Sequence, residues 1–393
     1  MTITHLCLGC FFPDGYSYQE NMLPKYHKLQ GHSVYVIASL QTFDENGHVA
    51  YMSGASKYTN ENDVQVIRLD YRSPVKVYKK LKRFIGTYKA IEDTNPDILF
   101  IHGCQFLDID VVVKYLKSHP SVKVFVDNHA DFSNSATNYL SLNILHKVIW
   151  KHCANLILPY TSKFYGVLPA RVDFLKNVYG LPESKVELLV MGADDQKVQQ
   201  ALKPENIKSM RELLKVNDST FLIMTGGKID LFKKQILLLM DAVNQLNNHN
   251  IKLIVFGSIV PEMKEEVNKR CSEYVSYIGW VNSNETDKYF AAADLVVFPG
   301  RHSVFWEQVC GLGIPMLCKK WDGTTHVDVG GNVIFLEKDS QEEIYDILKN
   351  IIIDKPERYR RMKQIACEKG KEQFSYDKIA ERSIREEVIG GVK

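Results

Sequence analysis

The segment with the clearest chemical potential is a glycine turn followed by lysines. In TGGKIDLFKKQILLLMDAV an apolar run ends in Gly226 and Gly227, and Lys228, Lys233 and Lys234 precede an amphipathic stretch. Glycines let backbone amides approach an anion, a helix N-terminus carries about half a positive charge, and lysines neutralise phosphate oxygens. The pattern predicts a diphosphate site or, alternatively, an ordinary strand-to-helix turn with solvated lysines. The chain contains neither GxxxxGK[ST] nor GxGxxG, which weighs against kinases, ATPases and dehydrogenases.

A second segment, DLVVFPGRHSVFWEQVCGLGIPMLCK, places polar residues between a predicted buried strand and a predicted helix. We expect the helix to begin near Ser303, whose hydroxyl would cap it, with His302 in the preceding loop. Glu307 and Gln308 follow in the first turns, where their side chains could bond sugar or ribose hydroxyls. The alternative is that Glu307 is an ordinary solvated helix residue.

These motifs need elements to position them, and the chain alternates short apolar runs with amphipathic segments from end to end. The alternation is typical of βα units, and it predicts an α/β protein with two Rossmann-like, doubly wound parallel-sheet domains. Strands are expected at 3–10, 32–38, 63–69, 97–103, 122–128, 154–159 and 186–192, then at 221–227, 251–257, 274–280, 294–300, 314–319 and 332–338. Ligands of open parallel sheets bind at the carboxyl ends of strands, so we expect the function in a cleft between two facing domains.

The domain boundaries follow from the length of 393 residues and from the polar stretch near 193–206, which is predicted to be a linker. A first domain is expected at 1–200, a second domain at 201–375, and a terminal helix at 376–393 that packs back on the first domain. The composition, 45% hydrophobic and 24% charged, excludes disordered and fibrous proteins. The formal net charge of +2 gives no general attraction to nucleic acid, and no such partner is expected.

The cysteines and the N-terminus indicate the compartment. Most of the eight cysteines lie in apolar runs, where a thiol behaves as a small hydrophobe, which favours a reducing, cytoplasmic setting. Cys7 and Cys10 form a CxxC pair, but no second pair at zinc-ligand spacing follows, so no metal site is expected. There is no basic leader before the first apolar run, and no stretch approaches the roughly 18 apolar residues that span a bilayer.

A basic stripe is predicted in YRSPVKVYKKLKRFIGTYKA, where Arg72, Lys76, Lys79, Lys80 and Arg83 recur at helical spacing opposite an apolar stripe. One interpretation is a helix packed on the first sheet with its lysines solvated. The other is a face that rests on an anionic bilayer, each basic residue contributing about 1 kcal/mol.

Three motifs, in order along the chain, resemble those of family 4 glycosyltransferases of the GT-B fold. The family's G-R-L-x-x-x-K-G stretch has its counterpart in Gly227, Lys228, Ile229, Lys233 and Lys234. A glycine loop after the first strand, a G-H-x-V before the second and a G-V-P-x-x-K-V-x-V-I-P-N-G-V-D signature have counterparts in FPDG at 12–15, GHSV at 31–34 and GLPESKVELLVMGAD at 180–194. The resemblance covers almost the whole chain. It implies that the N-terminal domain, 1–200, binds the acceptor and that the C-terminal domain, 201–375, binds the nucleotide sugar.

One family motif departs from its pattern. The E-x7-E pair of similar enzymes has its counterpart positions at Gly300 and Gln308. Either Glu307 replaces the second carboxylate after a one-residue shift, or the Gln308 amide holds the ribose.

The resemblance implies a retaining transfer of a sugar from a UDP- or GDP-sugar, with no metal or other cofactor. Lys228, Lys233 and the helix N-terminus would stabilise the departing diphosphate. The expected catalytic residues are His129, Lys228, Lys233 and Glu307, and the expected donor-binding residues are Gly226, Gly227, Lys228, Lys233, His302, Ser303, Glu307 and Gln308.

The resemblance also places His129 over the donor sugar and Gly15, Tyr16 and Asp131 on the acceptor side. His129 and Asp131 equally suit a polar loop without chemistry. His102, which follows another predicted strand, is expected to satisfy a backbone group at the strand end.

The acceptor expected from the resemblance and the basic stripe is a hydroxyl of a glycan, lipid-linked, in bacterial-type surface polysaccharide assembly. The protein would then be cytoplasmic and peripheral at the inner face of the cell membrane. Two alternatives stay open: a nucleotide-sugar epimerase on the same fold, and a non-catalytic nucleotide-binding subunit of a transferase complex.

Overall fold

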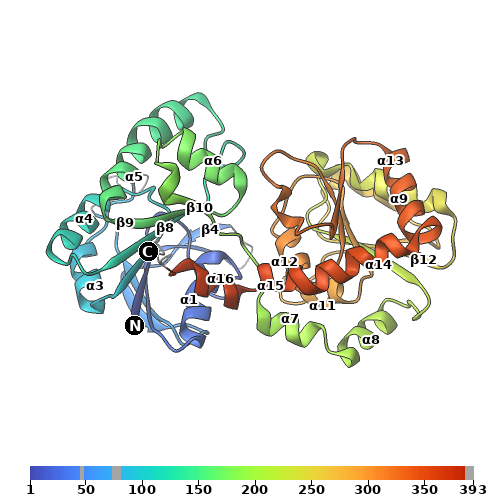
Figure 1. The fold of residues 1–393 in the computed structure, drawn as a ribbon, viewed down its shortest axis with the longest axis horizontal. Coiled ribbons are helices and arrows are strands. Elements are labelled where there is room, and N and C mark those ends of the chain that lie inside the picture. The colour runs from blue at the N-terminus through green and yellow to red at the C-terminus, as the bar shows by residue number, and fades with distance from the viewer. Residues whose placement is uncertain (45–47, 73–80, 386–393) are drawn as a thin grey trace, which may run out of the picture. The chain divides into compact units, whose positions relative to one another are not determined.

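The computed structural model describes residues 1–44, 48–72 and 81–385, which divide into two compact α/β units. Unit 1 contains Met1–Val190 and the segment from Tyr376, and unit 2 contains Met191–Ser375. Each unit has its own parallel sheet and its own apolar core (Figure 1). Among the described residues, no helix combines the length and the apolar character needed to span a membrane.

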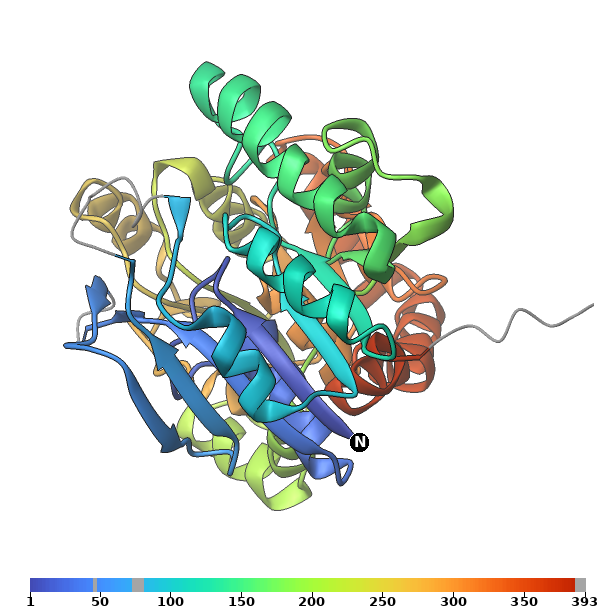
Figure 2. The same cartoon turned by 90° about the vertical axis from the view of Figure 1, so that its left-hand side faces the viewer.

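Unit 1 is built on an eight-stranded sheet in the order β10-β9-β8-β7-β1-β2-β6-β5, whose strands lie side by side in Figure 2. All its neighbouring pairs are parallel except β5 with β6, and a separate antiparallel pair joins β3 and β4. The strands are β1 (Thr2–Cys7), β2 (Ser33–Ser39), β3 (Gln41–Phe43), β4 (Val49–Tyr51), β5 (Ser56–Thr59), β6 (Gln65–Leu69), β7 (Ile98–His102), β8 (Lys123–Asn128), β9 (Thr161–Gly166) and β10 (Val186–Leu188).

The helices of unit 1 include one from the C-terminal segment. They are α1 (Gln19–Leu29), α3 (Thr87–Thr94), α4 (Ile109–Ser118), the π-helix η1 (Ser141–Trp150), α5 (Lys151–Ile157), α6 (Pro169–Asn177) and α16 (Tyr376–Ser383), with short 3-10 turns η2 (Leu158–Tyr160) and η3 (Glu183–Lys185). The amide of Gln30, at the end of α1, donates to the backbone and side-chain oxygens of Asp377 at 2.7 and 3.1 Å. Helix α16 thus packs on α1.

Unit 2 has an all-parallel, six-stranded sheet in the order β13-β12-β11-β14-β15-β16. Its strands are β11 (Phe221–Gly226), β12 (Ile251–Phe256), β13 (Val275–Tyr277), β14 (Leu295–Phe298), β15 (Met316–Lys319) and β16 (Val333–Leu336). Its helices are α7 (Asp195–Ala201), α8 (Pro204–Leu213), α9 (Ile236–Leu246), α10 (Pro261–Arg270), α11 (Thr286–Ala291), α12 (Phe305–Leu312), α13 (Gln341–Lys349), η6 (Asn350–Asp354), α14 (Pro356–Ile365), η7 (Ala366–Gly370) and α15 (Lys371–Gln373), with 3-10 turns η4 (Leu231–Lys233) and η5 (Thr325–Val327).

The strands are buried because helices cover both faces of each sheet. Every residue of β7, β8 after Lys123, and β14 is buried, as expected for central strands of a parallel sheet. From β11 the chain adds β12 and β13 on one side of the sheet, and then β14, β15 and β16 on the other side. The loops after β11 and β14 therefore leave the same edge of the sheet and run to opposite sides. Such a switch point is where open α/β sheets bind ligands.

One predicted strand is wrong. Residues 154–159 form the end of α5 and the turn η2, and the strand follows at Thr161–Gly166 as β9. Within α5 the buried residues are Cys153, Ala154 and Ile157, which have helical spacing. An apolar run of six residues fits a buried helix face as well as a strand, and the more polar TSKFYG gave no strand signal.

The predicted linker and basic stripe also differ from the structure. Residues 193–206 hold α7 and the start of α8, both in unit 2. At the end of the stripe, Lys82 has a left-handed φ of 56°, so Arg83 does not continue a helix, and Arg72 N donates to Arg83 O at 2.8 Å. The Arg83 guanidinium lies 2.7 Å from Asp110 and 3.3 Å from Asp108, so it is paired within unit 1. Lys76, Lys79 and Lys80 lie outside the described residues.

Candidate active site

The two motif loops of unit 2 meet in one pocket. Strands β11 and β14 are neighbours in the sheet, and the loops that follow them form the walls. The pocket is lined by Thr225, Gly226, Gly227, Lys228, Ile229, Lys233, Ile236, Phe298, Pro299, Gly300, Arg301 and Ser303. The structure therefore brings the predicted glycine and lysine residues together with Ser303, and it adds Arg301, which the sequence argument missed.

Close backbone packing explains the glycines at the carboxyl ends of β11 and β12. A Cβ on Gly226 would lie 2.3 Å from the Phe256 ring, and a Cβ on Gly257 would lie 1.8 Å from Gly227 O. Gly227 and Gly257 also have left-handed φ angles of 125° and 129°. No larger residue fits these positions without moving the loop, so the pocket wall depends on glycine there.

Three cationic side chains line the pocket. The side chain of Lys228 is 64% exposed and its Nζ lies 3.9 Å from Asp230 Oδ2. Lys233, in η4, is less exposed, and burial lowers its pKa, with Lys228 adding to that effect and Asp230 opposing it. The Arg301 guanidinium lies 5.3 Å from the centre of the Phe232 ring. Lys228 and Arg301 thus add two positive charges to the pocket that Lys233 lines, and a bound anion would offset the repulsion among the three.

Glu307 is not a pocket residue in this structure. Its side chain is fully buried in α12, and its Oε1 accepts hydrogen bonds from His302 Nε2 and His326 Nε2, both at 2.8 Å. Burial alone would raise the pKa of the Glu307 carboxyl, but His302 and His326 hold it well below its usual range. The alternative interpretation, in which Glu307 is an ordinary solvated helix residue, is therefore wrong.

Gln308 and Ser303 also differ from expectation. The Gln308 amide donates to Asp287 and, at 3.4 Å, to Thr286 of α11, so it is held by protein partners. Ser303 lines the pocket, but α12 has Val304 as its N-cap and no side-chain cap hydrogen bond in the described structure. The predicted cap is wrong by one residue.

In unit 1, His129 follows β8 and lies beside two carboxylates. Its side chain is 28% exposed, and its Nε2 lies 3.5 Å from Asp127 Oδ2 and 3.8 Å from Glu20 Oε1. Burial lowers the pKa of His129, but Glu20 and Asp127 outweigh that effect and raise it. A polarised imidazole with one accessible edge can donate a hydrogen bond to a substrate oxygen.

Asp131 holds the shape of the same loop. It accepts hydrogen bonds from the backbone and hydroxyl of Ser133, at 2.7 and 2.5 Å, and from Arg171 Nε at 3.1 Å. Although burial opposes it, Ser133 and Arg171 lower the pKa of Asp131. Its carboxylate is engaged on both oxygens, so we assign it to positioning the loop that carries His129.

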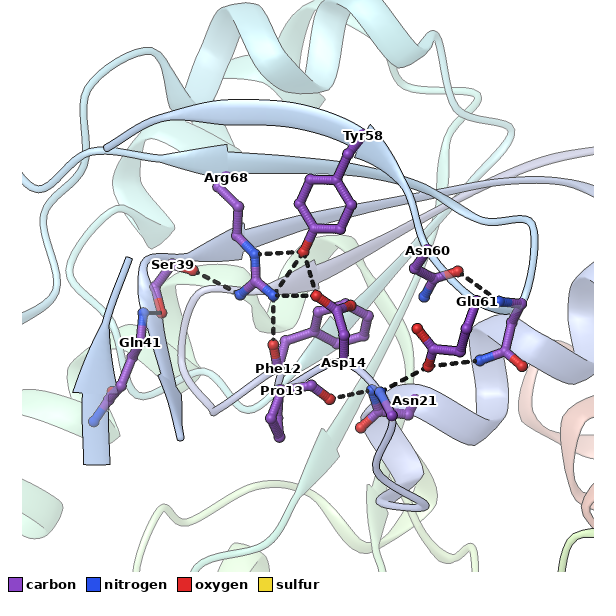
Figure 3. Close-up of polar contacts among 12 residues, drawn as sticks. Phe12, Pro13, Asp14, Asn21, Ser39, Gln41, Tyr58, Asn60, Glu61 and Arg68 are labelled. Carbon is purple, nitrogen blue, oxygen red and sulfur yellow. Dashed lines mark hydrogen bonds and ion pairs between the residues drawn. The ribbon is translucent and has the colours of Figure 1, made fainter. Parts of the chain in front are cut away.

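The loop that carries Gly15 and Tyr16 is anchored by a buried arginine (Figure 3). Arg68 of β6 donates to Phe12 O at 2.7 Å, to Ser39 O at 2.9 Å and to the Tyr58 hydroxyl. Tyr58 in turn donates to Asp14 Oδ2 at 2.6 Å.

Glu61 completes this anchoring. It accepts from the backbone N–H of Gly15 at 2.8 Å, and Asn21 donates to Pro13 O at 2.8 Å. Tyr16 projects from the held loop and stacks on Tyr18 with ring centres 5.5 Å apart. The loop is thus preorganised and presents exposed aromatic rings.

His102 does not cap a backbone group, so that prediction is wrong. Its nitrogens lie 3.0 Å from His5 and 2.7 Å from Asp127, both side chains. The sequence signal that could have found this contact is a histidine in each of two predicted buried strands, since an ionisable group there needs a partner.

Two groups in the described structure combine histidine and carboxylate atoms within 4.8 Å of one another. They are His102, Asp127 and His129, and His302, Glu307 and His326. In each group the shortest imidazole-to-carboxylate distance, 2.7 or 2.8 Å, is that of an N–H···O hydrogen bond. We assign neither as a metal site, and independence of metal stays a prediction.

Residues 220–352, about a third of the chain, match the family model described as Glycosyl transferases group 1. A protein of Methanocaldococcus jannaschii described as an uncharacterized glycosyltransferase is 27% identical over 135 residues, which are 33% of this chain and 34% of that protein. The match therefore spans about a third of that curated relative's length. These findings support a glycosyltransferase of the group 1 type.

Solved structures match nearly the whole chain. HepE of Anabaena in complex with UDP has a TM-score of 0.64 and 15% identity, covering 97% of this chain and 98% of that one. Sucrose-phosphate synthase of Thermosynechococcus elongatus has a TM-score of 0.64 and 15% identity, covering 97% of this chain and 96% of that one. UDP-GlcNAc 2-epimerase of Neisseria meningitidis bound to UDP-GlcNAc has a TM-score of 0.60 and 12% identity, covering 97% of this chain and 98% of that one. The likeness confirms the predicted fold, α/β with two parallel-sheet domains of the GT-B type.

Proposed function

We propose that this protein transfers a sugar from a nucleotide diphosphate sugar to an acceptor hydroxyl, and that the pocket of unit 2 holds the diphosphate. The observation that supports this most is the convergence of Lys228, Lys233 and Arg301 on the glycine turn after β11. Anomeric bond cleavage places negative charge on the departing diphosphate, and fixed cations in a partly dry pocket stabilise that charge. Three of the similar structures are complexes with UDP, with UDP and glucose, and with UDP-glucose, which supports a uridine nucleotide as the first donor to test.

The remaining assignments follow the resemblance to family 4 enzymes. We assign His129 to the transferred sugar, and the loop of Gly15 and Tyr16 to the acceptor. Retention of anomeric configuration, without a bound metal, belongs to the same proposal. Glu307 is assigned to the support of α12, because both of its histidine partners and its burial remove it from solvent.

For the acceptor we propose a glycan hydroxyl, lipid-linked, in surface polysaccharide assembly at the inner face of the cell membrane. The exposed rings of Tyr16 and Tyr18 support a sugar acceptor, since an aromatic face packs against the apolar side of a pyranose. The membrane contact has less support, because Arg83 is already paired with Asp108 and Asp110.

A panel of nucleotides in a thermal-shift measurement tests the donor assignment. A ligand that binds only the folded state stabilises it by about 2.7 kcal/mol at a hundred times its Kd. We expect UDP and UDP-sugars to raise Tm. In Lys228→Ala or Lys233→Ala, at least a tenfold higher ligand concentration should be needed for the same rise in Tm. Lys234→Ala is the matched control, because Lys234 is exposed and does not line the pocket. An equal loss in all three variants would contradict the pocket assignment.

A nucleotide-sugar epimerase is the second candidate, favoured by the likeness to the Neisseria meningitidis 2-epimerase. Product analysis separates the candidates. A transferase releases nucleotide only when acceptor is present, whereas an epimerase converts its donor alone. Binding without turnover under either condition would instead support the non-catalytic subunit.

A further inference from the structure

Four buried side chains of unit 1 form a hydrogen-bonded row that ends beside His129. His27 Nδ1 lies 3.1 Å from His5 Nε2, and His5 Nδ1 lies 3.0 Å from His102 Nε2. His102 Nδ1 lies 2.7 Å from Asp127 Oδ2. The row crosses from α1 through the neighbouring strands β1, β7 and β8, and all four residues are 0% exposed.

The chemistry of its two ends fixes where each proton lies. His27 Nε2 is 3.0 Å from the backbone oxygen of Ala380 in α16 and 3.2 Å from Ser383 Oγ. The Ser383 hydroxyl donates to that same backbone oxygen at 2.8 Å, so both partners accept from His27 and its Nε2 carries hydrogen. A neutral His27 then accepts at Nδ1 from His5 Nε2, and a neutral His5 accepts at Nδ1 from His102 Nε2. At the other end, the Asp127 carboxylate accepts from His102 Nδ1.

His102 therefore donates from both nitrogens and is an imidazolium, whereas His5 and His27 are neutral. The pKa directions agree with this order. Burial and its histidine neighbours hold the pKa of His5 well below its usual value, and burial lowers that of His27 to about 3. Burial opposes the charge on His102 as well, but Asp127 raises its pKa to about 9.

Asp127 is shared between this row and His129. Its Oδ2 accepts from His102 and lies 3.5 Å from His129 Nε2. Within the described chain, Asp127 Oδ1 and His129 Nε2 have no hydrogen-bond partner, so both have capacity for a closer contact. Catalytic hydrogen bonds are often long in a ligand-free protein and shorten when the substrate binds.

The other ionisable groups that face this site come from four elements. Glu20 of α1 raises the pKa of His129 and Arg171 of α6 lowers it. Cys7 of β1 and Glu20 act on His102, and Cys10, just after β1, faces Asp127. Burial raises the pKa of Cys10, so its thiol adds no charge beside Asp127.

We propose that the row positions the imidazole of His129 and sets its charge, which makes Asp127 and His102 positioning residues for the sugar transfer. The inference rests on the proposed function for the role of His129, but its test does not require turnover. The four ionisable side chains of the row cost more to bury than apolar residues of similar volume, and a row with one proton order gives a defined charge beside His129.

The protonation states are tested first in the unaltered protein. Nitrogen-15 spectra of labelled histidine distinguish the two tautomers and the imidazolium. At pH 7 we expect His102 to be doubly protonated and His5 and His27 to be neutral with hydrogen on Nε2. A neutral His102, or an imidazolium at His5 or His27, would overturn the row as described. This measurement needs no variant and no substrate.

Two variants then give opposite results if the row sets the charge of His129. Asp127→Asn removes the anion beside His129 and should lower its pKa by about one pH unit. His102→Gln keeps a donor but removes the compensating cation, so Asp127 should raise the pKa of His129 by a similar amount. If the pKa of His129 shifts in the same direction in both variants, or in neither, the proposal is overturned. General structural damage would not move this pKa in opposite directions in the two variants.

His146 serves as the internal control. It lies in unit 1 but bonds Ser135 and Tyr179, at 2.9 Å each, and does not touch the row. Its titration should not move in either variant. Once an acceptor is known, the pH profile of kcat/KM should move in opposite directions in the two variants. Opposite NMR shifts without any sugar transfer would sustain the row and reject the proposed function, so the two failures are distinguishable.

Discussion

Two buried carboxylates, Asp127 in unit 1 and Glu307 in unit 2, each accept hydrogen bonds from imidazole groups. An isolated charge in a protein interior is costly, and each of these is offset by partners at hydrogen-bond distance. The functional consequence differs. Asp127 lies beside the partly exposed His129, whereas Glu307 is surrounded by α12 and its histidine neighbours.

Replacing Glu307 with Gln should lower the free energy of unfolding by about 3 kcal/mol at pH 7, because His302 and His326 lose a charged acceptor. The folded-state pKa of Glu307 is depressed, so its contribution is present above the unfolded value of about 4.5 and is lost as pH falls below it. The difference in urea unfolding between the wild type and the variant should therefore shrink progressively as pH falls below about 4.5, and should vanish only below the depressed folded-state pKa. Glu337→Gln, at an exposed ion pair with Lys320, should change little at either pH.

At this scale the sequence showed the pocket residues but not the buried row. Gly226, Gly227, Lys228 and Lys233 are contiguous enough for the motif to reveal them. His5, His27 and His102 come from distant segments, and only the strand order places them together. The sequence also did not predict the roles of Arg68 and Arg301, because neither residue is part of a recognisable pattern.

Elements hold the pocket by close approach of two strand ends. Gly227 N donates to Phe256 O at 3.1 Å, and Gly257 N donates to Gly279 O at 2.7 Å, which ties the loops after β11, β12 and β13 together. A pocket wall made of backbone contacts has a defined shape before any ligand arrives, which lowers the entropic cost of binding.

Gly257→Ala tests whether this packing matters for binding. Its Cβ would lie 1.8 Å from Gly227 O, so the wall must move, and we expect a loss of about 2–4 kcal/mol in unfolding free energy and a weaker UDP-induced thermal shift. Gly279→Ala is the matched control: its φ is also left-handed, at 83°, but a Cβ meets nothing within 4 Å. It should cost about 1 kcal/mol and leave the UDP response intact. Equal effects of the two variants would mean that the strain of a left-handed φ, and not the Cβ contact with Gly227 O, causes the loss of stability.

The elements that the sequence mispredicted share one cause. In 154–159 and around Lys82, local pattern competed with partners that come from elsewhere in the chain. The apolar run of α5 packs as a helix against the core of unit 1, and Arg83 leaves its expected stripe to pair with Asp108 and Asp110. The long apolar runs of β7, β11 and β12 had no such competition, and their predicted positions agree with the structure.

At the scale of the whole molecule, alternation of apolar and amphipathic segments was sufficient to predict the fold class. A parallel sheet covered by helices buries apolar runs such as ILFIH and IKLIVF on both faces, and the amphipathic segments between them supply those helices. A terminal helix that packs back on the first domain was expected at 376–393. The C-terminal segment from Tyr376 belongs to unit 1, where α16 closes the His27 end of the buried row.

Hydrogen exchange of the full chain shows which unit carries the nucleotide. UDP at a hundred times its Kd should slow amide exchange by up to about a hundredfold wherever exchange requires the pocket to open. Every described residue that lines the pocket belongs to unit 2, so we expect the slowing in 225–236 and 298–303. Helix α10, in the same unit but outside the pocket lining, should be unchanged. At the same UDP concentration, Lys233→Ala should reduce the slowing to about tenfold or less, whereas Lys234→Ala should retain it. Protection centred on β8 and the loop after it would instead place the nucleotide beside His129, and the pocket after β11 would lose its assigned role.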